Sequence, residues 1–259
     1  MLKVFHIISG DLWAGAEVMA YNLLKGLKAY NNLSLSAILL NEGKLAGKIR
    51  KLGIDVHVVD ENVGCFFRIL SSVRKILRTE PPDLIHSHRY KENILSLISS
   101  KGSSNAKLIT TQHGMPEARG ESISLKHRFV SKINMYLLSK CFDRVITVSE
   151  EMQNAFVNSL GFSEEKVMVI HNGMEIPELP FDRGKKECFV VGSSGRLFPV
   201  KDYPFMIEIA KAVSETTDSI RFQLAGDGPE MSKLRSIAEA YGLNSTFELK
   251  GHEIGRAHV

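Results

Sequence analysis

Short apolar runs alternate with helical patterns along almost the whole chain, and this alternation limits the fold more than any other feature. The first series of expected strands is Lys3–Ile8, Leu35–Leu40, Asp55–Val59, Leu84–His86, Lys107–Thr111, Arg144–Val148 and Val167–His171. The helices expected between them are Glu17–Lys28, Leu45–Leu52, Phe66–Arg78, Glu92–Ser100, Ser124–Lys140 and Glu150–Leu160. Apolar strands separated by helices form parallel sheets that are covered on both faces. The sequence therefore predicts an α/β fold.

The alternation stops once, after residue 175, and then resumes. Residues 176–186 (IPELPFDRGKK) hold two prolines, a glycine and a charge cluster, which is the composition of a linker. The second series has strands Phe189–Val191, Arg221–Ala225 and Phe247–Lys250, with helices Tyr203–Val213 and Glu230–Tyr241. We therefore expect a first domain over residues 1–175, a linker over 176–186 and a second domain over 187–259.

The second series ends after three strands, with only GHEIGRAHV beyond the last one. A parallel α/β sheet buries both faces only when its helices and edge strands are complete. We therefore expect the second domain to be incomplete and the chain to be truncated at its C-terminus.

The composition narrows the class of protein. Hydrophobic residues make up 44% of the 259 residues, which is enough for a packed core. A net charge of +4 suits phosphate-bearing substrates or an anionic membrane surface, and speaks only weakly for nucleic acid. The three cysteines are widely spaced and form no CxxC pair, so the reducing cytosol is the expected compartment. No run approaches the roughly 18 apolar residues of a membrane-spanning helix.

The stretch Cys188–Asp202 (CFVVGSSGRLFPVKD) predicts an anion-binding loop. A short apolar run ends in a loop that contains Gly192, Gly195, Arg196 and Lys201, and helical spacing begins directly after it. The first turn of a helix offers unpaired backbone N–H groups and a partial positive charge. Two cationic side chains stand beside that turn, so we interpret the loop as a binding site for a diphosphate.

Two further loops with glycines follow expected strands. In SGDLWAGAE, Gly15 closes a GxxxxG pattern, but Ala16-Glu17 replaces the Lys and Ser/Thr of a P-loop. This loop is either a plain turn or a place where the backbone approaches a phosphate or sugar. In LAGDGPE, Gly226 and Gly228 form a tight turn that can admit the ribose or base of a nucleotide.

Histidines stand at the ends of two expected strands. His86 and His88, in DLIHSH, share one face of a strand, but two ligands do not make a metal site and no third is identifiable. They either contact their neighbours or lie near a substrate, because ligands collect at the carboxyl ends of strands. His113, in TTQHG, either has a structural role or faces a cleft, where it could donate a hydrogen bond or exchange a proton. We predict no metal site.

The expected helix Ser124–Lys140 is amphipathic. Its apolar stripe consists of Leu125, Phe129, Ile133, Tyr136 and Leu137. Basic residues surround this stripe, namely Lys126, His127, Arg128, Lys132 and Lys140. The helix is either an ordinary domain helix with a solvated basic face or one that rests on an anionic membrane surface.

Taken in order, a series of short segments resembles the retaining, nucleotide-sugar-dependent glycosyltransferases of the GT4 type. The segments are SGDLWAGAE, DLIHSH, TTQHG, RVITVSEEM, VMVIHNGM, GSSGRLFPVKDY, LAGDGPEMSKL and FELKGH. The resemblance implies the GT-B fold, in which two Rossmann-like domains face a cleft. It also implies that the C-terminal domain holds most of the donor and the N-terminal domain most of the acceptor.

The resemblance implies roles for individual residues as well. Arg196 and Lys201 match the pair that binds the donor diphosphate, which is the role that the residue types indicate independently. Gly15 matches the glycine loop near the donor phosphate and the transferred sugar. His113 matches the cleft histidine near that sugar, so the catalytic residues implied are His113, Arg196 and Lys201.

Other matches concern the nucleoside. Gly226 and Gly228 match the loop beside it, and Gly251 and His252 match the loop that borders the base. The family's later acidic EX7E element, whose second glutamate binds the donor ribose, does not occur before the chain ends. We therefore expect this form to bind its donor incompletely.

The chemistry implied is transfer of a sugar, with retention, from a UDP- or GDP-linked donor to a hydroxyl of a carbohydrate or lipid-linked acceptor. No metal or other cofactor is implied, and the expected role is surface polysaccharide or glycolipid synthesis. We expect a cytoplasmic protein that can touch the inner membrane face and has no nucleic-acid partner. Two alternatives remain open: a GT-B sugar-nucleotide epimerase, and a non-catalytic nucleotide-binding or interaction module.

Overall fold

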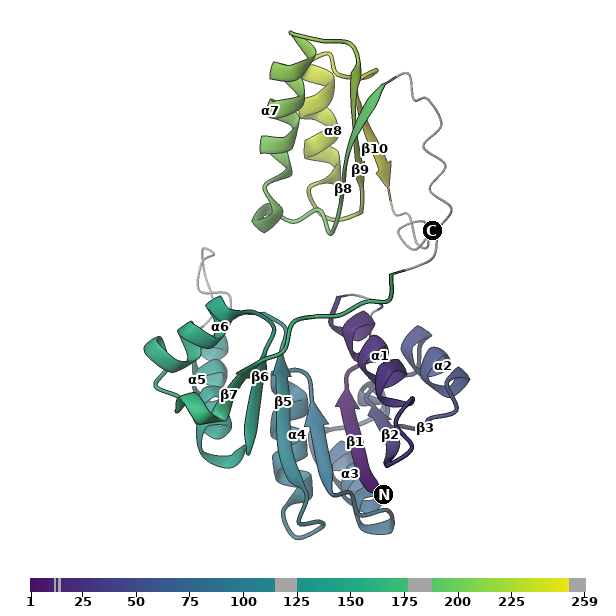
Figure 1. The fold of residues 1–259 in the computed structure, drawn as a ribbon, viewed down its shortest axis with the longest axis vertical. Helices are drawn as coiled ribbons and strands as arrows, with labels where there is room; N and C mark the ends of the chain where they lie inside the picture. The colour runs from purple at the N-terminus through teal and green to yellow at the C-terminus, as the bar shows by residue number, and fades with distance from the viewer. Residues whose placement is uncertain (12, 14, 115–124, 177–187, 252–259) are drawn as a thin grey trace. The chain divides into compact units, whose positions relative to one another are not determined.

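The computed structural model describes residues 1–11, 13, 15–114, 125–176 and 188–251, which belong to two compact units (Figure 1). The first unit is Met1–Met174 and the second is Glu175–Val259. Of the predicted linker, only Ile176 lies among the described residues.

The first unit contains a parallel sheet with the strand order β3-β2-β1-β4-β5-β6-β7. The strands are β1 (Leu2–Ile8), β2 (Leu33–Leu39), β3 (Asp55–Val58), β4 (Leu84–Ser87), β5 (Lys107–Gln112), β6 (Arg144–Thr147) and β7 (Val167–Val169). Each of them begins and ends within two residues of the range that the apolar runs predict. The predicted α/β class is confirmed.

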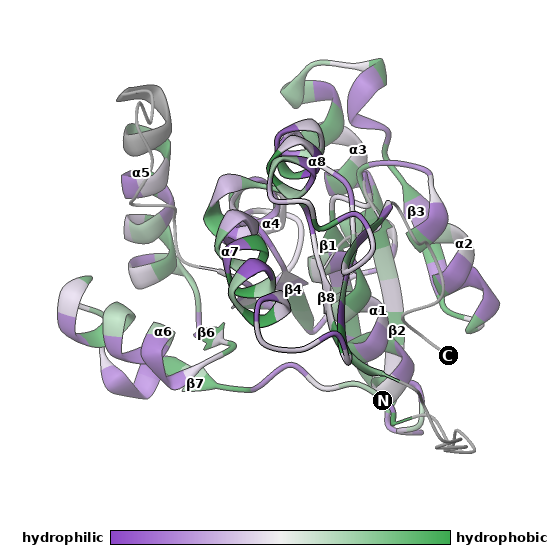
Figure 2. Ribbon diagram, turned by 90° about the horizontal axis from the view of Figure 1, so that it is seen from above, coloured by the Kyte–Doolittle hydropathy of each residue, from purple (hydrophilic) through white to green (hydrophobic). Residues whose placement is uncertain are grey.

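Helices connect these strands as expected. They are α1 (Gly15–Leu27), α2 (Lys44–Lys51), α3 (Phe66–Thr79), α4 (Tyr90–Ser100), α5 (Leu125–Cys141) and α6 (Glu150–Asn154). Short segments η1 (Glu61–Val63), η2 (Ala155–Ser159) and η3 (Glu164–Lys166) add 3₁₀ turns and, at η2, one π-helical turn. In Figure 2, helices such as α5 and α6 carry both hydrophobic and hydrophilic segments, which fits helices that cover a sheet.

Alternate residues of the central strands pack against different helices, because successive side chains of a strand point to opposite faces. Val4 and Ile8 of β1 belong to a buried cluster with residues of α1 and α2. Phe5 and Ile7 of the same strand belong to a second cluster, with residues of α3, α4 and α5. Both faces of the sheet are therefore covered.

The strand order reverses at β1, which lies between β2 and β4. The chain moves outward from β1 to β3 and then returns to β4 on the other side of β1. In open α/β sheets, ligands bind at such a switch point, beyond the carboxyl ends of the strands. Functional side chains of this unit are therefore expected in the segments after β1, β4 and β5.

The second unit contains a three-stranded parallel sheet with the order β10-β9-β8. Its elements are β8 (Phe189–Ser194), η4 (Pro199–Lys201), α7 (Tyr203–Ser214), β9 (Ile220–Ala225), α8 (Met231–Ala240) and β10 (Phe247–Gly251). Leu197, Ile207, Leu224 and Leu234 are completely buried at the centre of its core. No helix in the described part of the chain is long and apolar enough to cross a membrane.

Candidate functional site

The loop after β8 carries the predicted anion-binding residues, and backbone hydrogen bonds fix it against the loop after β9. The Gly195 N–H donates to the Ala225 carbonyl at 3.0 Å, and the Leu197 N–H donates to the Asp227 carbonyl at 2.9 Å. The Glu230 N–H donates back to the Leu197 carbonyl at 3.2 Å. Since Leu197 is also fully buried, Arg196 projects from a backbone that is held on both sides.

The two glycines after β9 allow this close contact between loops. A Cβ on Gly226 would lie 1.9 Å from the Gly195 carbonyl oxygen, and one on Gly228 would lie 2.5 Å from the Leu197 carbonyl oxygen. Both positions also have positive φ, at +154° and +159°. Glycine is therefore required here by the chain's own packing, and the nucleoside-binding role of this loop stays a prediction.

Arg196 and Lys201 are both exposed. The Arg196 guanidinium carbon lies 5.3 Å from the centre of the Phe198 ring, and Lys201 ends η4, just before α7 begins. Within the described ranges neither cation forms an ion pair. Asp202 precedes α7 in the left-handed conformation (φ 49°), and its side chain does not cap the helix. Arg196 and Lys201 thus lie in the segment that leads from β8 into α7, and the positive end of a helix dipole stabilises an anion.

The third strand of this unit ends at the same place. The Gly226 N–H donates to the Gly251 carbonyl at 2.8 Å, so Gly251 lies beside the glycine loop. The structure therefore brings Arg196, Gly226, Gly228 and Gly251 to one edge of the small sheet. His252 lies outside the described residues.

In the first unit, Gly15 is the first residue of α1. A Cβ built on Gly15 would have no heavy atom within 4 Å, unlike one on Gly226 or Gly228. The start of the helix is held by Arg89, which forms ion pairs with Glu17 at 2.5 Å and with Asp11 at 3.5 Å. The space over Gly15 is thus open, on a helix whose position is fixed.

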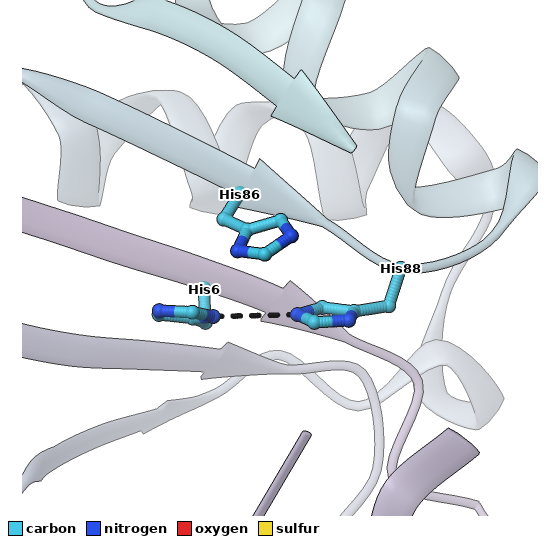
Figure 3. Close-up of side chains that lie close together, drawn as sticks. All are labelled: His6, His86 and His88. Carbon is cyan, nitrogen blue, oxygen red and sulfur yellow. Dashed lines mark hydrogen bonds between the residues drawn. The ribbon is translucent and has the colours of Figure 1, made fainter. Parts of the chain in front are cut away.

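Three neighbouring strands contribute a cluster of histidines, shown in part in Figure 3. His6 of β1 is in register with His86 of β4, and His88 follows β4 directly. His6 Nδ1 lies 3.3 Å from His88 Nε2, and His88 Nδ1 lies 3.3 Å from His113 Nε2. His86 Nε2 makes a separate bond of 2.8 Å with Thr111 Oγ1. His6, His88 and His113 thus form one series of hydrogen-bonded rings, the histidine chain His6–His88–His113.

Burial keeps these imidazoles neutral. It lowers the pKa of His6 from 6.5 to about 4, and that of His113 also to about 4, where the Arg89 charge adds to the effect. Burial also holds the pKa of His86 and of His88 well below the usual value, with the neighbouring histidines as a second cause. At neutral pH each ring therefore carries a single proton.

By distance alone, His6, His86 and His88 could ligate a metal, because one ligand atom from each lies within 4.8 Å of the others. A tetrahedral zinc site needs in-plane lone pairs that converge on one point about 2 Å from each nitrogen. In the structure, nitrogens of these rings are engaged in hydrogen bonds: His6 Nδ1 pairs with His88 Nε2, and His86 Nε2 pairs with Thr111 Oγ1. The absence of a metal from the reaction stays a prediction.

The participation of His6 is the part of the site that sequence reasoning missed. The sequence pointed to His86, His88 and His113 because each stands at the end of a strand, whereas His6 lies inside an apolar strand. A polar residue within a buried strand is itself a signal, since buried polar groups need partners. Its partner becomes clear only when β1 and β4 are known to be adjacent.

The sequence itself matches known families over both units. The profile of Glycosyltransferase Family 4 matches residues 13–176, and the profile of Glycosyl transferases group 1 matches residues 175–254. The chain belongs to Glycosyltransferase Family 4. The segments that the two profiles cover include every predicted site residue.

Two similar proteins are glycosyltransferases by name, and one of them is named for capsular polysaccharide biosynthesis. An Escherichia coli UDP-Gal:alpha-D-GlcNAc-diphosphoundecaprenol alpha-1,3-galactosyltransferase is 27% identical over 182 residues, which are 64% of this chain and 46% of that protein. The Staphylococcus aureus capsular polysaccharide biosynthesis glycosyltransferase CapH is 25% identical over 256 residues, 97% of this chain and 70% of that protein. The matched part of the chain thus spans 46% of the length of the first relative and 70% of the second.

Solved structures show the fold. Anabaena HepE in complex with UDP and glucose superposes with a TM-score of 0.77 at 22% identity, over 97% of this chain and 70% of that one. Staphylococcus aureus TarM superposes with a TM-score of 0.72 at 12% identity, over 98% and 77%. The Glycosyltransferase Family 4 chain thus has the GT-B-like fold that its sequence predicts.

Proposed function

We propose that the protein is a glycosyltransferase of surface polysaccharide or glycolipid synthesis. In this proposal it moves a sugar, with retention, from a nucleoside-diphosphate sugar to a hydroxyl of a carbohydrate or lipid-linked acceptor. The observation that carries the proposal is the pair of exposed cations Arg196 and Lys201 in the segment between β8 and α7. Membership of Glycosyltransferase Family 4 and the names of the relatives support the reaction class.

The reaction develops negative charge on the leaving diphosphate while the transferred sugar becomes oxocarbenium-like. Arg196 and Lys201 stabilise that charge together with the first turn of α7, because fixed positive groups aimed at developing charge lower the barrier. The acceptor hydroxyl attacks from the side of the leaving group, and the departing diphosphate takes its proton. These charges do the work of a metal, so the reaction proceeds without one.

The donor in this proposal is a UDP-linked or GDP-linked sugar. UDP has support from the solved structures, since HepE holds UDP and glucose and a Staphylococcus aureus MnaA is also described as a complex with UDP. The family resemblance assigns Gly226, Gly228, Gly251 and His252 to the nucleoside, and Gly15 and His113 to the transferred sugar. An epimerase has a related fold, as a UDP-N-acetylglucosamine 2-epimerase superposes with a TM-score of 0.59 at 9% identity.

The test is calorimetric binding of UDP, together with transfer from UDP-sugars and GDP-sugars to a lipid-linked acceptor. Arg196→Ala and Lys201→Ala should each weaken binding by roughly 10- to 100-fold, the usual worth of a charge-assisted contact. Arg235→Ala is the matched control, since Arg235 is an exposed cation on α8 of the same unit. Transfer should survive EDTA.

Three other outcomes would contradict the proposal or favour one of its alternatives. Unchanged UDP affinity in both cation variants contradicts the diphosphate site. Conversion of the donor to an epimer in the absence of an acceptor supports the epimerase alternative, and tight binding without transfer supports a binding module.

A lipid-linked acceptor has support from α5. Three residues of the predicted apolar stripe do not turn inward: Phe129 is 66% exposed, Ile133 38% and Tyr136 63%, while Leu137 packs against the core. The buried residues of this part of the helix are Asn134 and Leu138 instead. Exposed Lys132 and Lys140 lie on the same helix, and such a combination favours an anionic membrane surface.

Vesicle sedimentation tests this contact. Phe129→Ser combined with Tyr136→Ser should reduce binding to vesicles that contain phosphatidylglycerol by several-fold, because two aromatic rings no longer enter the interface. Tyr30→Ser is the control, since Tyr30 is 61% exposed but lies outside α5. Equal vesicle binding by the wild type and the double variant would contradict a membrane role for α5.

A further inference from the structure

The chain His6–His88–His113 has two unpartnered ends. Its inner end is His6 Nε2 and its outer end is His113 Nδ1; both atoms are buried, and neither has a hydrogen-bond partner among the described residues. His6 is completely buried, whereas His113 is partly exposed at the carboxyl end of β5. The two ends therefore differ in what can reach them.

Proton counting leaves two arrangements. Three neutral imidazoles carry three protons, and two of these lie in the two hydrogen bonds between the rings. The third proton must be on one end of the histidine chain. If each N–H donates towards His6, the third proton is on His6 Nε2, which is the inward arrangement. If each N–H donates towards His113, the third proton is on His113 Nδ1, which is the outward arrangement.

The surroundings select the outward arrangement. A buried N–H without an acceptor is among the most costly polar groups in a protein, and a buried nitrogen lone pair is tolerated more readily. Neither His6 Nε2 nor His113 Nδ1 has an acceptor among the described residues. His6 is completely buried inside β1, so nothing from outside can reach its Nε2. His113 is partly exposed at the carboxyl end of β5, so after a small movement of its ring an oxygen of a bound molecule can accept a proton from Nδ1.

We propose that His6 and His88 are positioning residues that hold His113 in the Nδ1–H tautomer, so that His113 acts only as a hydrogen-bond donor to an oxygen of the bound sugar donor. His6 Nδ1–H donates to His88 Nε2, and His88 Nδ1–H donates to His113 Nε2. The second nitrogen of His113 is thus already occupied as an acceptor. Of the two roles open to this histidine, hydrogen-bond donation and proton exchange, the chain selects the first.

The ring contacts hold the geometry as well. His88 stacks on His113 with 5.6 Å between ring centres and 18° between planes, and on His86 at 4.4 Å. The bond from His86 Nε2 to Thr111 lies outside the chain. His86 therefore helps to pack His88 but does not determine which nitrogen of His113 carries the proton. The low pKa of His113, about 4, agrees with a ring that does not accept a proton at neutral pH.

The test is a long-range ¹H–¹⁵N correlation spectrum of the 259-residue chain labelled with ¹⁵N-histidine, with His113→Gln used for assignment. The wild type should show His113 as the Nδ1–H tautomer without any ligand, and its Nδ1–H signal should shift when a UDP-sugar binds. An Nε2–H tautomer of His113 in the wild type overturns the proposal.

Variants at His88 test which ring donates each hydrogen bond in the histidine chain. His88→Leu removes the donor to His113 Nε2 and should turn His113 to the Nε2–H tautomer, with a several-fold loss of UDP-sugar affinity. His88→Asn places an amide N–H where Nδ1 stands and should restore the Nδ1–H tautomer. His86→Gln changes a histidine that is as buried as His88 and lies two residues before it, and it should leave the tautomer unchanged. An unaltered tautomer in a folded His88→Leu protein also overturns the proposal.

The role assigned to His113 rests on the proposed function, but the two can fail separately. The tautomer is measured without substrate. A wild type with the Nδ1–H tautomer but without sugar transfer supports the histidine chain and contradicts the transferase.

Discussion

The glycines around the candidate site differ in what a side chain would meet at each. At Gly226 a Cβ would collide with the Gly195 carbonyl oxygen at 1.9 Å, so glycine is needed for the second unit to fold. At Gly15 the space is open, and the chain itself does not require glycine there. Open space over the first residue of a helix lets a ligand approach its N–H groups. Glycine at position 226 is therefore a structural requirement, whereas the structure leaves room for a ligand at Gly15.

This difference predicts opposite results for two identical substitutions. Gly15→Ala should leave the free energy of unfolding within about 1 kcal/mol of wild type, because alanine suits a helix, while UDP-sugar affinity falls. Gly226→Ala should lower the free energy of unfolding by roughly 3–5 kcal/mol through collision and backbone strain. Urea unfolding and calorimetry measure the two quantities. Wild-type UDP-sugar affinity in Gly15→Ala would show that this glycine does not face the donor.

Residue types at strand ends reveal part of the site without a structure. Arg196 and Lys201 could be predicted because a strand end, a glycine loop and a helix start follow one another in the sequence. His6 could not, because its partner His88 is 82 residues away and the contact depends on β4 lying next to β1. Local patterns report local geometry, and long-range contacts depend on strand order.

At the scale of elements, periodicity located the helices and strands but not changes within a helix. The predicted helix Glu150–Leu160 is α-helical only to Asn154 and continues as the π-helical turn Ala155–Ser159. This wider turn accompanies complete burial of Phe156, whose ring centre lies 5.1 Å from that of Phe162. A π turn adds a residue without breaking the apolar pattern over so short a stretch, so the sequence alone does not reveal it.

A serine side chain caps the start of the same helix and should stabilise the fold. Ser149 is the N-cap of α6, and its Oγ accepts a hydrogen bond from the Met152 N–H at 3.2 Å. Ser149→Ala should lower the free energy of unfolding by about 1 kcal/mol, because the N–H loses its partner. Ser163→Ala is the control, since Ser163 precedes η3 without a side-chain cap bond. Equal effects in urea unfolding would contradict a capping role.

At the scale of the whole molecule, alternation predicted two parallel α/β series but not the order of the strands. Sequential strands pair in many topologies, and only the reversal at β1 places the ends of β1, β4 and β5 together. The histidine cluster occupies this position and connects those three strands. Its protonation state therefore affects the stability of the whole first unit, and not only the site.

The stability of the first unit should consequently depend on pH between about 4 and 6.5. The pKa of His6 falls from 6.5 in the unfolded chain to about 4 in the folded one, so the unfolded state binds more protons in this range. The stabilisation is complete above pH 6.5 and is lost as the pH falls towards 4. At pH 5 His6 alone should reduce the free energy of unfolding by roughly 2 kcal/mol. Burial raises the pKa of Glu92, which acts in the opposite direction.

Urea unfolding at pH 7.5, 6 and 5 measures this dependence, followed by the fluorescence of Trp13, the one tryptophan of the chain, which lies in the first unit. His6→Leu removes one of the titrating groups, so the difference between wild type and variant isolates its share from that of Glu92. The wild type should lose more stability than His6→Leu between pH 7.5 and 5. His171→Gln, which changes an exposed histidine, should behave as the wild type does. Parallel pH profiles for wild type and His6→Leu would mean that His6 is not held neutral in the folded chain.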